Sequence, residues 1–139
     1  MTRPDYFRAV FPVCFWMYGL LLVVATHVPS AKVQFLVKAV DFGTFAPDKL
    51  LHMAAYAVLG LLAVLAYGSR WRRPATGVIV VSALFVMLAA WGILDEATQP
   101  FFGRAADVVD WAYDVVGVVL GLAAGLVASR WLDRQAASG

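Results

Sequence analysis

The sequence predicts an all-α membrane protein, a four-transmembrane-helix bundle that forms a single domain over residues 1–139. Hydrophobic residues make up 63% of the chain and charged residues only 14%, against roughly 25% charged residues in an ordinary soluble domain. A soluble domain of this length could not bury so much apolar surface, because small domains bury the smallest share of their surface. The second observation is that the few charged residues leave long stretches between them uncharged.

The uncharged stretches set the expected spans. Asp, Glu, Lys and Arg are absent from residues 9–31, 50–69 and 74–94. Each stretch reaches the roughly 20 residues that a helix needs to cross a hydrocarbon core of about 30 Å. A fourth stretch, 111–129, is interrupted by Asp114 alone. We therefore expect spans at about 9–27, 49–69, 74–96 and 110–130.

The first span is expected to be retained in the membrane. Its apolar stretch is longer than the roughly 7–15 residues of a signal-peptide core. The single cysteine, Cys14, lies in this stretch and excludes an internal disulfide.

The basic residues predict that both termini are cytoplasmic in a multi-pass protein of the cell membrane. With four spans, the termini and the connection between the second and third spans share one side. That side carries Arg3, Arg8, Arg70, Arg72, Arg73, Arg130 and Arg134, and the other carries Lys32, Lys38, Lys49 and Arg104. Cytoplasmic loops are enriched in Lys and Arg, which favours the first side as cytoplasmic.

The connection over residues 27–47 would then lie outside the cell. Apolar residues recur there at helical spacing, at Val33, Leu36, Val37 and Val40. This pattern predicts a short interfacial helix on the membrane surface, with an ordered loop as the alternative.

Polar residues gather at the outer ends of the last three spans. The second span begins with Asp48, Lys49, His52 and Tyr56, the third ends with Asp95, Glu96 and Gln99, Arg104 follows, and the fourth begins with Asp107, Asp110 and Asp114. Spacings of three and four place residues on one face of a helix. The topology thus brings these side chains to one depth of the bundle.

Glycines continue the face that carries Asp110 and Asp114. They lie at Gly117, Gly121 and Gly125, and a glycine at every fourth position lets another helix approach closely in lipid. We therefore expect this face to pack inward, where ionisable groups are tolerated and are often functional.

The crowding of six acidic residues beside Lys49 and Arg104 requires compensation. Protonation, a bound cation or exposure to water would each relieve it. We expect exposure for Asp48, Asp95 and Asp107, and burial for Asp110 and Asp114.

These residues resemble the VanZ-like family of small polytopic membrane proteins. The resemblance is carried by Asp48-Lys49-x-x-His52-x-x-x-Tyr56, Glu96-x-x-Gln99, Gly103-Arg104, Asp110 and a glycine-rich last helix. The family pattern has Asn where this chain has Asp114, so the role of that position is not carried over. The family takes its name from glycopeptide antibiotic resistance, and the resemblance implies a cell-envelope context without a defined reaction.

Three functions are compatible with this pattern. In the first, the cluster binds a phosphorylated lipid head group or a cation. Its ligand-binding candidates are Asp48, Lys49, His52, Tyr56, Glu96, Gln99, Arg104, Asp110 and Asp114. Arg104 and Lys49 would contact phosphate, and a divalent cation would be held by His52, Glu96, Asp110 and Asp114. If the protein is an enzyme, His52 and Glu96 are the candidate acid or base.

The two other functions involve no bound ligand of this kind. In one, the cluster is a structural network of ion pairs, such as Arg104 with Glu96 or Asp110. In the other, it belongs to a proton or ion pathway, although the polar residues are confined to one side of the membrane. The expected partners are membrane lipids, and the sequence contains no basic region typical of nucleic-acid binding.

Overall fold

The computed structural model describes residues 5–28, 47–67 and 74–138. Within these ranges it contains α1 (Asp5–Thr26), α3 (Pro47–Tyr67), α4 (Pro74–Thr98), the short 3-10 helix η2 (Gln99–Phe102) and α5 (Val108–Ser138). The four α-helices are long and apolar enough to cross a membrane, which confirms the expected all-α, four-helix fold. The surface helix expected around residues 33–40 lies outside the described residues.

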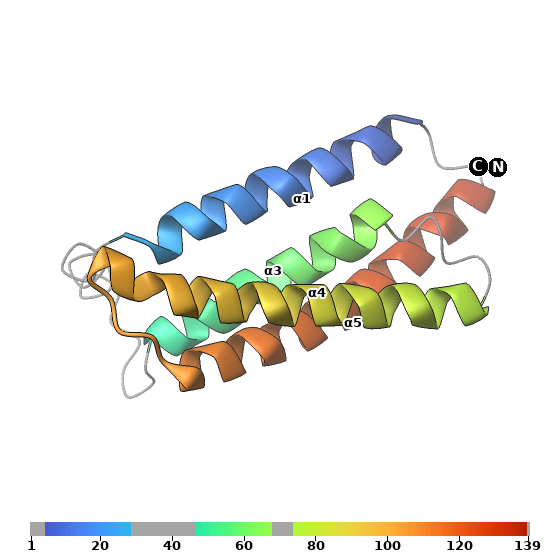
Figure 1. The fold of residues 1–139 in the computed structure, drawn as a ribbon. Coiled ribbons are helices and arrows are strands. Elements are labelled where there is room, and N and C mark those ends of the chain that lie inside the picture. The colour runs from blue at the N-terminus through green and yellow to red at the C-terminus, as the bar shows by residue number, and fades with distance from the viewer. Residues whose placement is uncertain (1–4, 29–46, 68–73, 139) are drawn as a thin grey trace.

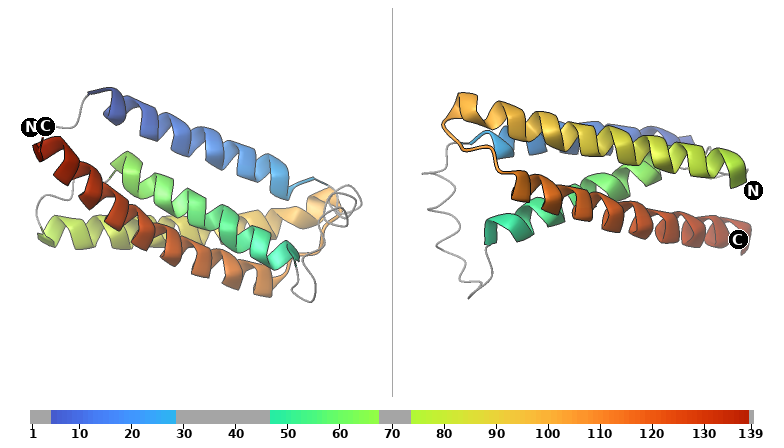
Figure 2. Two further views of the ribbon diagram at one scale, coloured as in Figure 1. Left: turned by 180° about the vertical axis from the view of Figure 1, so that it is seen from behind. Right: turned by 60° about the horizontal axis from the view of Figure 1, so that its bottom comes forward.

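The helices alternate in direction along the bundle. In Figure 1, α1 and α4 run toward the same end, and α3 and α5 start from that end and run back. We call this end of the bundle the site end. There α1 ends at Thr26 and α4 at Thr98, and α3 begins at Pro47 and α5 at Val108. Two further views show the same arrangement, with α3 crossing against α5 (Figure 2).

Local sequence signals explain how the chain turns from α4 into α5. Pro100 lies in η2, and Gly103 ends η2 with a φ of 74°, a left-handed conformation that glycine adopts without strain. Asp107 then precedes α5, and its Oδ1 accepts a hydrogen bond of 2.8 Å from the backbone N–H of Val109. This is the geometry of an N-cap, which satisfies one of the free N–H groups at the start of a helix.

The closest helix pair is α3 and α5, and it depends on glycine. The two helices run in the same direction and share the most extensive contact in the described chain. A Cβ atom at Gly117 would overlap the carbonyl oxygen of Met53, and one at Gly121 would overlap that of Ala57. The glycine face predicted from the sequence therefore packs inward.

Two more glycines complete this contact. A Cβ at Gly125 would come within 2.6 Å of the Cβ of Val64, so the seam extends over about two turns of α5. On the opposite helix, a Cβ at Gly60 would lie 2.9 Å from the carbonyl oxygen of Val118. Gly60 was not singled out from the sequence, because a single glycine in an apolar helix has no repeat to mark it.

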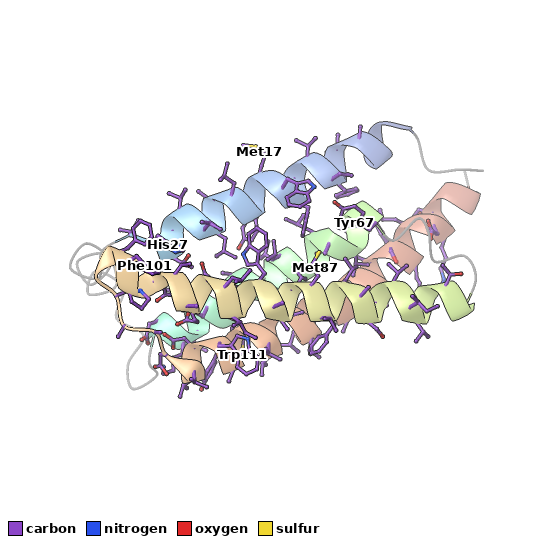
Figure 3. The ribbon with its side chains drawn as sticks, viewed as in Figure 1. Met17, His27, Tyr67, Met87, Phe101 and Trp111 are labelled. Carbon is purple, nitrogen blue, oxygen red and sulfur yellow. The ribbon has the colours of Figure 1, made fainter. Side chains whose placement is uncertain are left out.

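The remaining helices flank this pair, with α1 packed mainly on α3 and α4 mainly on α5. The Tyr18 hydroxyl of α1 donates a hydrogen bond of 3.1 Å to the carbonyl of Ala55. Met17 is 61% exposed and points away from the other helices, as Figure 3 shows. Large apolar side chains on the outside of a bundle are expected where the surrounding solvent is lipid.

We predict that Gly121→Leu prevents the close approach of α3 and α5. A leucine side chain would have to displace the backbone of Ala57, so we expect a loss of about 3 kcal/mol or more, the upper end of overpacking costs. Thermal unfolding in detergent would measure it. Ala124→Leu on the exposed face of α5 is the control and should unfold like the parent. Equal stability of the two variants would contradict the packing of this seam.

Candidate functional site

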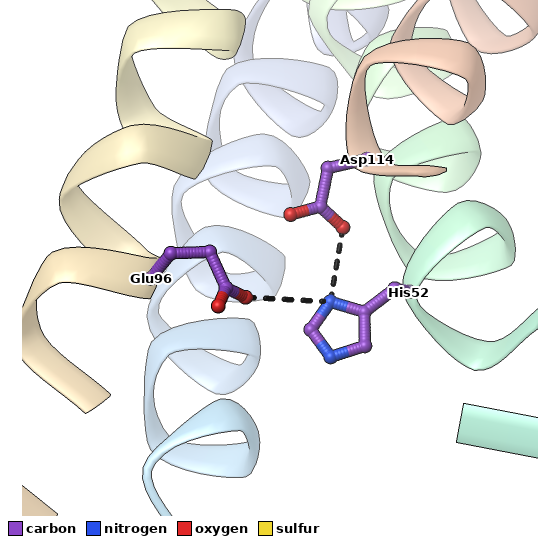
Figure 4. A group of neighbouring side chains, drawn as sticks. All are labelled: His52, Glu96 and Asp114. Atoms are coloured by element: carbon purple, nitrogen blue, oxygen red, sulfur yellow. Dashed lines mark hydrogen bonds and ion pairs between the residues drawn. The ribbon is translucent and has the colours of Figure 1, made fainter. Parts of the chain in front are cut away.

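Three helices bring a histidine and two carboxylates together at the site end. His52 comes from α3, Glu96 from α4 and Asp114 from α5. Figure 4 shows the carboxylates on the side of the ring that carries Nδ1. The Nδ1 atom lies 3.0 Å from Asp114 Oδ1 and 4.0 Å from Glu96 Oε1. We call these three residues the central triad.

The central triad is shielded from the surroundings. His52 is 7% exposed, Glu96 6% and Asp114 1%. One ligand atom from each residue lies within 4.8 Å of the others, a spacing that could hold a metal ion. A buried charge without compensation is costly, so a cluster of this kind requires positive charge, protons or strong hydrogen bonds.

Hydrogen bonds orient Glu96 from two sides. Gln99, one turn further along, donates from Nε2 to Glu96 Oε1 over 2.8 Å. The backbone N–H of Asp107 donates to the other oxygen, Oε2, over 3.0 Å. The carboxylate is therefore fixed by the end of α4 and by the residue that caps α5.

Two buried atoms at this end have no hydrogen-bond partner within the described residues. They are Asp114 Oδ2 and Gln99 Oε1, and Gln99 is 0% exposed. Buried polar atoms are nearly always paired, so such atoms call for an explanation, an unseen ion or water among them. A Cβ at Gly92 would meet Oδ2 at an ordinary contact distance of 3.5 Å, and its tighter contact would be with the Trp111 ring at 3.2 Å.

An ion-pair bridge joins α3 to the start of α5. Lys49 Nζ lies 2.7 Å from Asp110 Oδ1 and 3.1 Å from Asp107 Oδ2. Asp110 is buried, whereas the side chain of Asp107 is 43% exposed. The hydrogen bond from the Val109 backbone, followed by that from Lys49, holds the pKa of Asp107 below its ordinary value. The Lys49 bridge is thus the more exposed layer above the central triad.

Asp110 approaches the histidine from the other side. Its Oδ2 lies 4.0 Å from His52 Nε2, while the central triad meets at Nδ1. The sequence grouped Asp110 with Asp114 as metal ligands. The structure separates them, because the two nitrogens of an imidazole point in different directions, and the potential metal group contains Asp114 without Asp110.

A second polar cluster attaches α1 to α4 at the same end. The hydroxyl of Thr26 donates to Asp95 Oδ1 over 2.7 Å, and the Tyr56 hydroxyl lies 3.5 Å from Oδ2. The ring of His27 lies 3.7 Å from Asp95 through Nδ1 and 2.9 Å from Thr98 Oγ1 through Nε2. We call this set the α1 anchor; Figure 3 labels His27 at this end of α1.

The α1 anchor corrects two expectations. Asp95 was expected to be exposed, but it is 4% exposed because α1 covers it and Thr26 bonds to it. Arg104 was expected beside Glu96 or Asp110. Its Nη1 instead donates over 3.0 Å to the carbonyl of Thr26, which has no partner within its own helix because α1 ends there.

The other candidates are placed as follows. Asp110 and Asp114 are buried and Asp48 is exposed, as expected. Tyr56 is fully buried, and its hydroxyl donates to Asp95. Sequence reasoning missed Thr26, His27 and Thr98; the signal available was a polar Thr-His pair at the end of an apolar span.

Comparison with known proteins finds no matching family model, curated protein or solved structure. The resemblance to the VanZ-like family therefore stays a prediction from the motif, and the function must be argued from the site itself.

We predict that Thr26→Val weakens the α1 anchor. The change is nearly isosteric, but it removes the 2.7 Å hydrogen bond to a buried carboxylate, which costs about 1–3 kcal/mol. The melting temperature in detergent would measure the loss. Thr76→Val, at an exposed position of α4, should have no comparable effect, and equal melting temperatures for both variants would refute the role of Thr26.

Proposed function

We propose that this protein binds a divalent cation in the central triad of His52, Glu96 and Asp114. The observation that carries the proposal is the combination of three buried ligand atoms within 4.8 Å and, beside them, an Asp114 oxygen without a hydrogen-bond partner in the described part of the chain. Metal–ligand distances of about 2.0–2.2 Å place neighbouring ligand atoms roughly 3–4 Å apart. The separations of 3.0 and 4.0 Å from His52 Nδ1 are close to this range.

The charge balance supports a cation. Asp95, Glu96, Asp110 and Asp114 are four buried acids. Within the described chain, the basic side chains in ion-pair contact with them are the Lys49 ammonium and the imidazoles of His27 and His52. A divalent ion would compensate the excess of carboxylates at the place where Asp114 Oδ2 has no partner among the described residues.

The ligand types favour a first-row transition metal over calcium. Imidazole suits zinc and related ions, and carboxylate oxygens suit manganese as well. Calcium takes 6–8 oxygen ligands, more than this site offers. Three protein ligands leave at least one coordination position open, as in zinc sites that bind an external oxygen.

Direct binding of a lipid phosphate by basic side chains has less support. Lys49 is held by two carboxylates, and Arg104 is bonded to the carbonyl of Thr26. A phosphorylated head group would therefore have to meet the site through the bound ion, which attracts anionic oxygens.

A structural ion-pair network is the second candidate, and the Lys49 bridge favours it. It connects α3 to α5 through Asp110 and Asp107 without any ligand. In a purely structural network, removal of one buried charge typically costs about 3–5 kcal/mol. In a cation site, neutralising one ligand removes repulsion in the empty protein and abolishes binding.

We predict that Zn²⁺ or Mn²⁺ raises the melting temperature of the purified protein. An ion that binds only the folded state adds about 2.7 kcal/mol at a hundredfold excess over its dissociation constant. Glu96→Gln should abolish this gain while it leaves the metal-free protein at least as stable as the parent. Differential scanning fluorimetry in detergent, with and without chelator, would measure both effects.

Asp48→Asn is the matched control, because Asp48 is an exposed acid at the same end of the bundle. This variant should keep the full metal response. A parent without any metal response, together with strong destabilisation by Glu96→Gln, would refute cation binding and favour the structural network.

We also propose that the site end faces the outside of the cell, a proposal that rests on the seven-to-four distribution of Lys and Arg. In a Cys14→Ser background, we predict that Ala106→Cys is labelled by a membrane-impermeant thiol reagent in intact cells. Gln135→Cys, near the end of α5, should be labelled only after lysis. The reverse pattern would place the site on the cytoplasmic side.

A further inference from the structure

We propose that Asp110 is a positioning residue, which selects Nδ1 of His52 as the metal-binding nitrogen by accepting a hydrogen bond from Nε2–H. This inference rests on the proposed cation site. It concerns which ring nitrogen holds the ion and what fixes that choice.

The His52 ring lies between two carboxylates. Asp114 Oδ1 is 3.0 Å from Nδ1, and Asp110 Oδ2 is 4.0 Å from Nε2. Without a metal, the short contact to an ionised Asp114 requires a proton on Nδ1. An ion can bind Nδ1 only when that proton is absent. A neutral imidazole that binds an ion through Nδ1 carries its single proton on Nε2. Ion binding therefore releases the Nδ1 proton to solvent, and Nε2 takes up a proton from solvent.

Asp110 is placed to receive this N–H. Metal-bound histidines usually donate their other ring N–H to a carboxylate, a carbonyl or water, which fixes the ring and raises the basicity of the ligating nitrogen. Among the described residues, Asp110 supplies the carboxylate in ion-pair contact with Nε2. The 4.0 Å separation closes to a hydrogen bond when the ring turns as Nδ1 engages the ion.

Lys49 sets the orientation of Asp110. Its ammonium binds Oδ1 at 2.7 Å, which leaves Oδ2 directed to the imidazole. Lys49 is itself held by Asp107 Oδ2 at 3.1 Å. Asp107 is in turn fixed as the N-cap of α5, and its backbone N–H donates to Glu96 Oε2.

The same outer layer therefore orients two ligands of the central triad. Asp110 acts on His52, and the backbone of Asp107 acts on Glu96. In this proposal His52, Glu96 and Asp114 contact the ion. The Lys49 bridge does not contact it but holds His52 and Glu96 in place.

Two variants with the same charge change test the proposal. In Asp110→Asn, the amide oxygen can face Lys49 only if the amide NH₂ faces Nε2, which disfavours a proton there. We expect zinc affinity to fall about 10–100-fold, the usual effect of losing such a partner. Asp48→Asn also removes one acid at the same end of the bundle, but Asp48 is exposed and is not part of the Lys49 bridge, so this variant should leave the affinity unchanged. Isothermal titration calorimetry in detergent would give both values.

Nitrogen NMR of the ¹⁵N-histidine-labelled protein reports which ring nitrogen is protonated and which is ligated, a result that a change of net charge alone would not alter. In the zinc-loaded parent, we expect His52 to show a protonated Nε2 and a ligated Nδ1, with His27→Gln used for assignment. Asp110→Glu, which restores the carboxylate, should recover most of the affinity.

The outcomes separate this inference from the proposed function. A parent that binds neither zinc nor manganese overturns both. Zinc binding through Nε2, or equal weakening by Asp110→Asn and Asp48→Asn, overturns the positioning role alone. If Asp110→Asn fails to fold, the ring nitrogens of the zinc-loaded parent still decide which one is the ligand.

Discussion

The close approach of α3 and α5 is the constraint on which the rest of the structure depends. Gly117 meets the carbonyl of Met53, and the neighbours of this contact are His52 on one helix and Asp114 on the other. A side chain at the glycine would separate the two backbones and would also lengthen the 3.0 Å contact between imidazole and carboxylate. Association in lipid relies on such packing because apolar side chains gain nothing by leaving an apolar solvent.

The seam also explains how buried acids are tolerated at this end. Packing α3 directly on α5 turns Asp110 and Asp114 toward protein, where a charged side chain costs less than against hydrocarbon. Lys49 reaches Asp110 from the same helix pair, so the ammonium and the carboxylate share one location. Acids near the start of α5 also interact favourably with the positive end of its helix dipole. Glycine packing, the N-cap at Asp107 and the ion-pair bridge thus reinforce one arrangement.

The sequence predicted the helices well because the signal is simple. Charge-free stretches of sufficient length must be helical in a bilayer, since no water is present to satisfy the backbone. The repeat of Gly117, Gly121 and Gly125 likewise predicted a packing face, because spacing determines the face of a helix. Burial of Asp110 and Asp114 followed from that face. Each of these predictions depends only on the sequence of a single helix.

The contacts that the sequence could not predict depend on how the helices pack against one another. Asp95 is buried because Thr26, 69 positions earlier in the chain, packs beside it. The spacing of residues within α4 does not predict this contact with another helix. Arg104 binds the end of α1 instead of an acid for the same reason. Asp110 and Asp114 share a helix face, yet they meet different nitrogens of His52 because the ring, which belongs to another helix, lies between them.

The α1 anchor shows why a site of this kind benefits from α1, the helix that supplies no residue of the central triad. Large side chains of α1 such as Met17 face outward. Its hydrogen bonds to other helices include that of Tyr18 to Ala55, midway along α1, and those of Thr26 and His27 at the site end. Through Thr26 and Arg104, the end of α1 is bonded both to α4 and to the loop before α5. Asp95 lies next to Glu96 in the chain, so a bond that fixes the first also restrains the backbone of the second. Each of the three helices that supply the central triad is therefore held near its ligand: α3 and α5 by the glycine seam and α4 by the α1 anchor. Under the proposed cation binding, the carboxylates are already held together in the ion-free protein, so that the cost of organising them is met by folding rather than by binding.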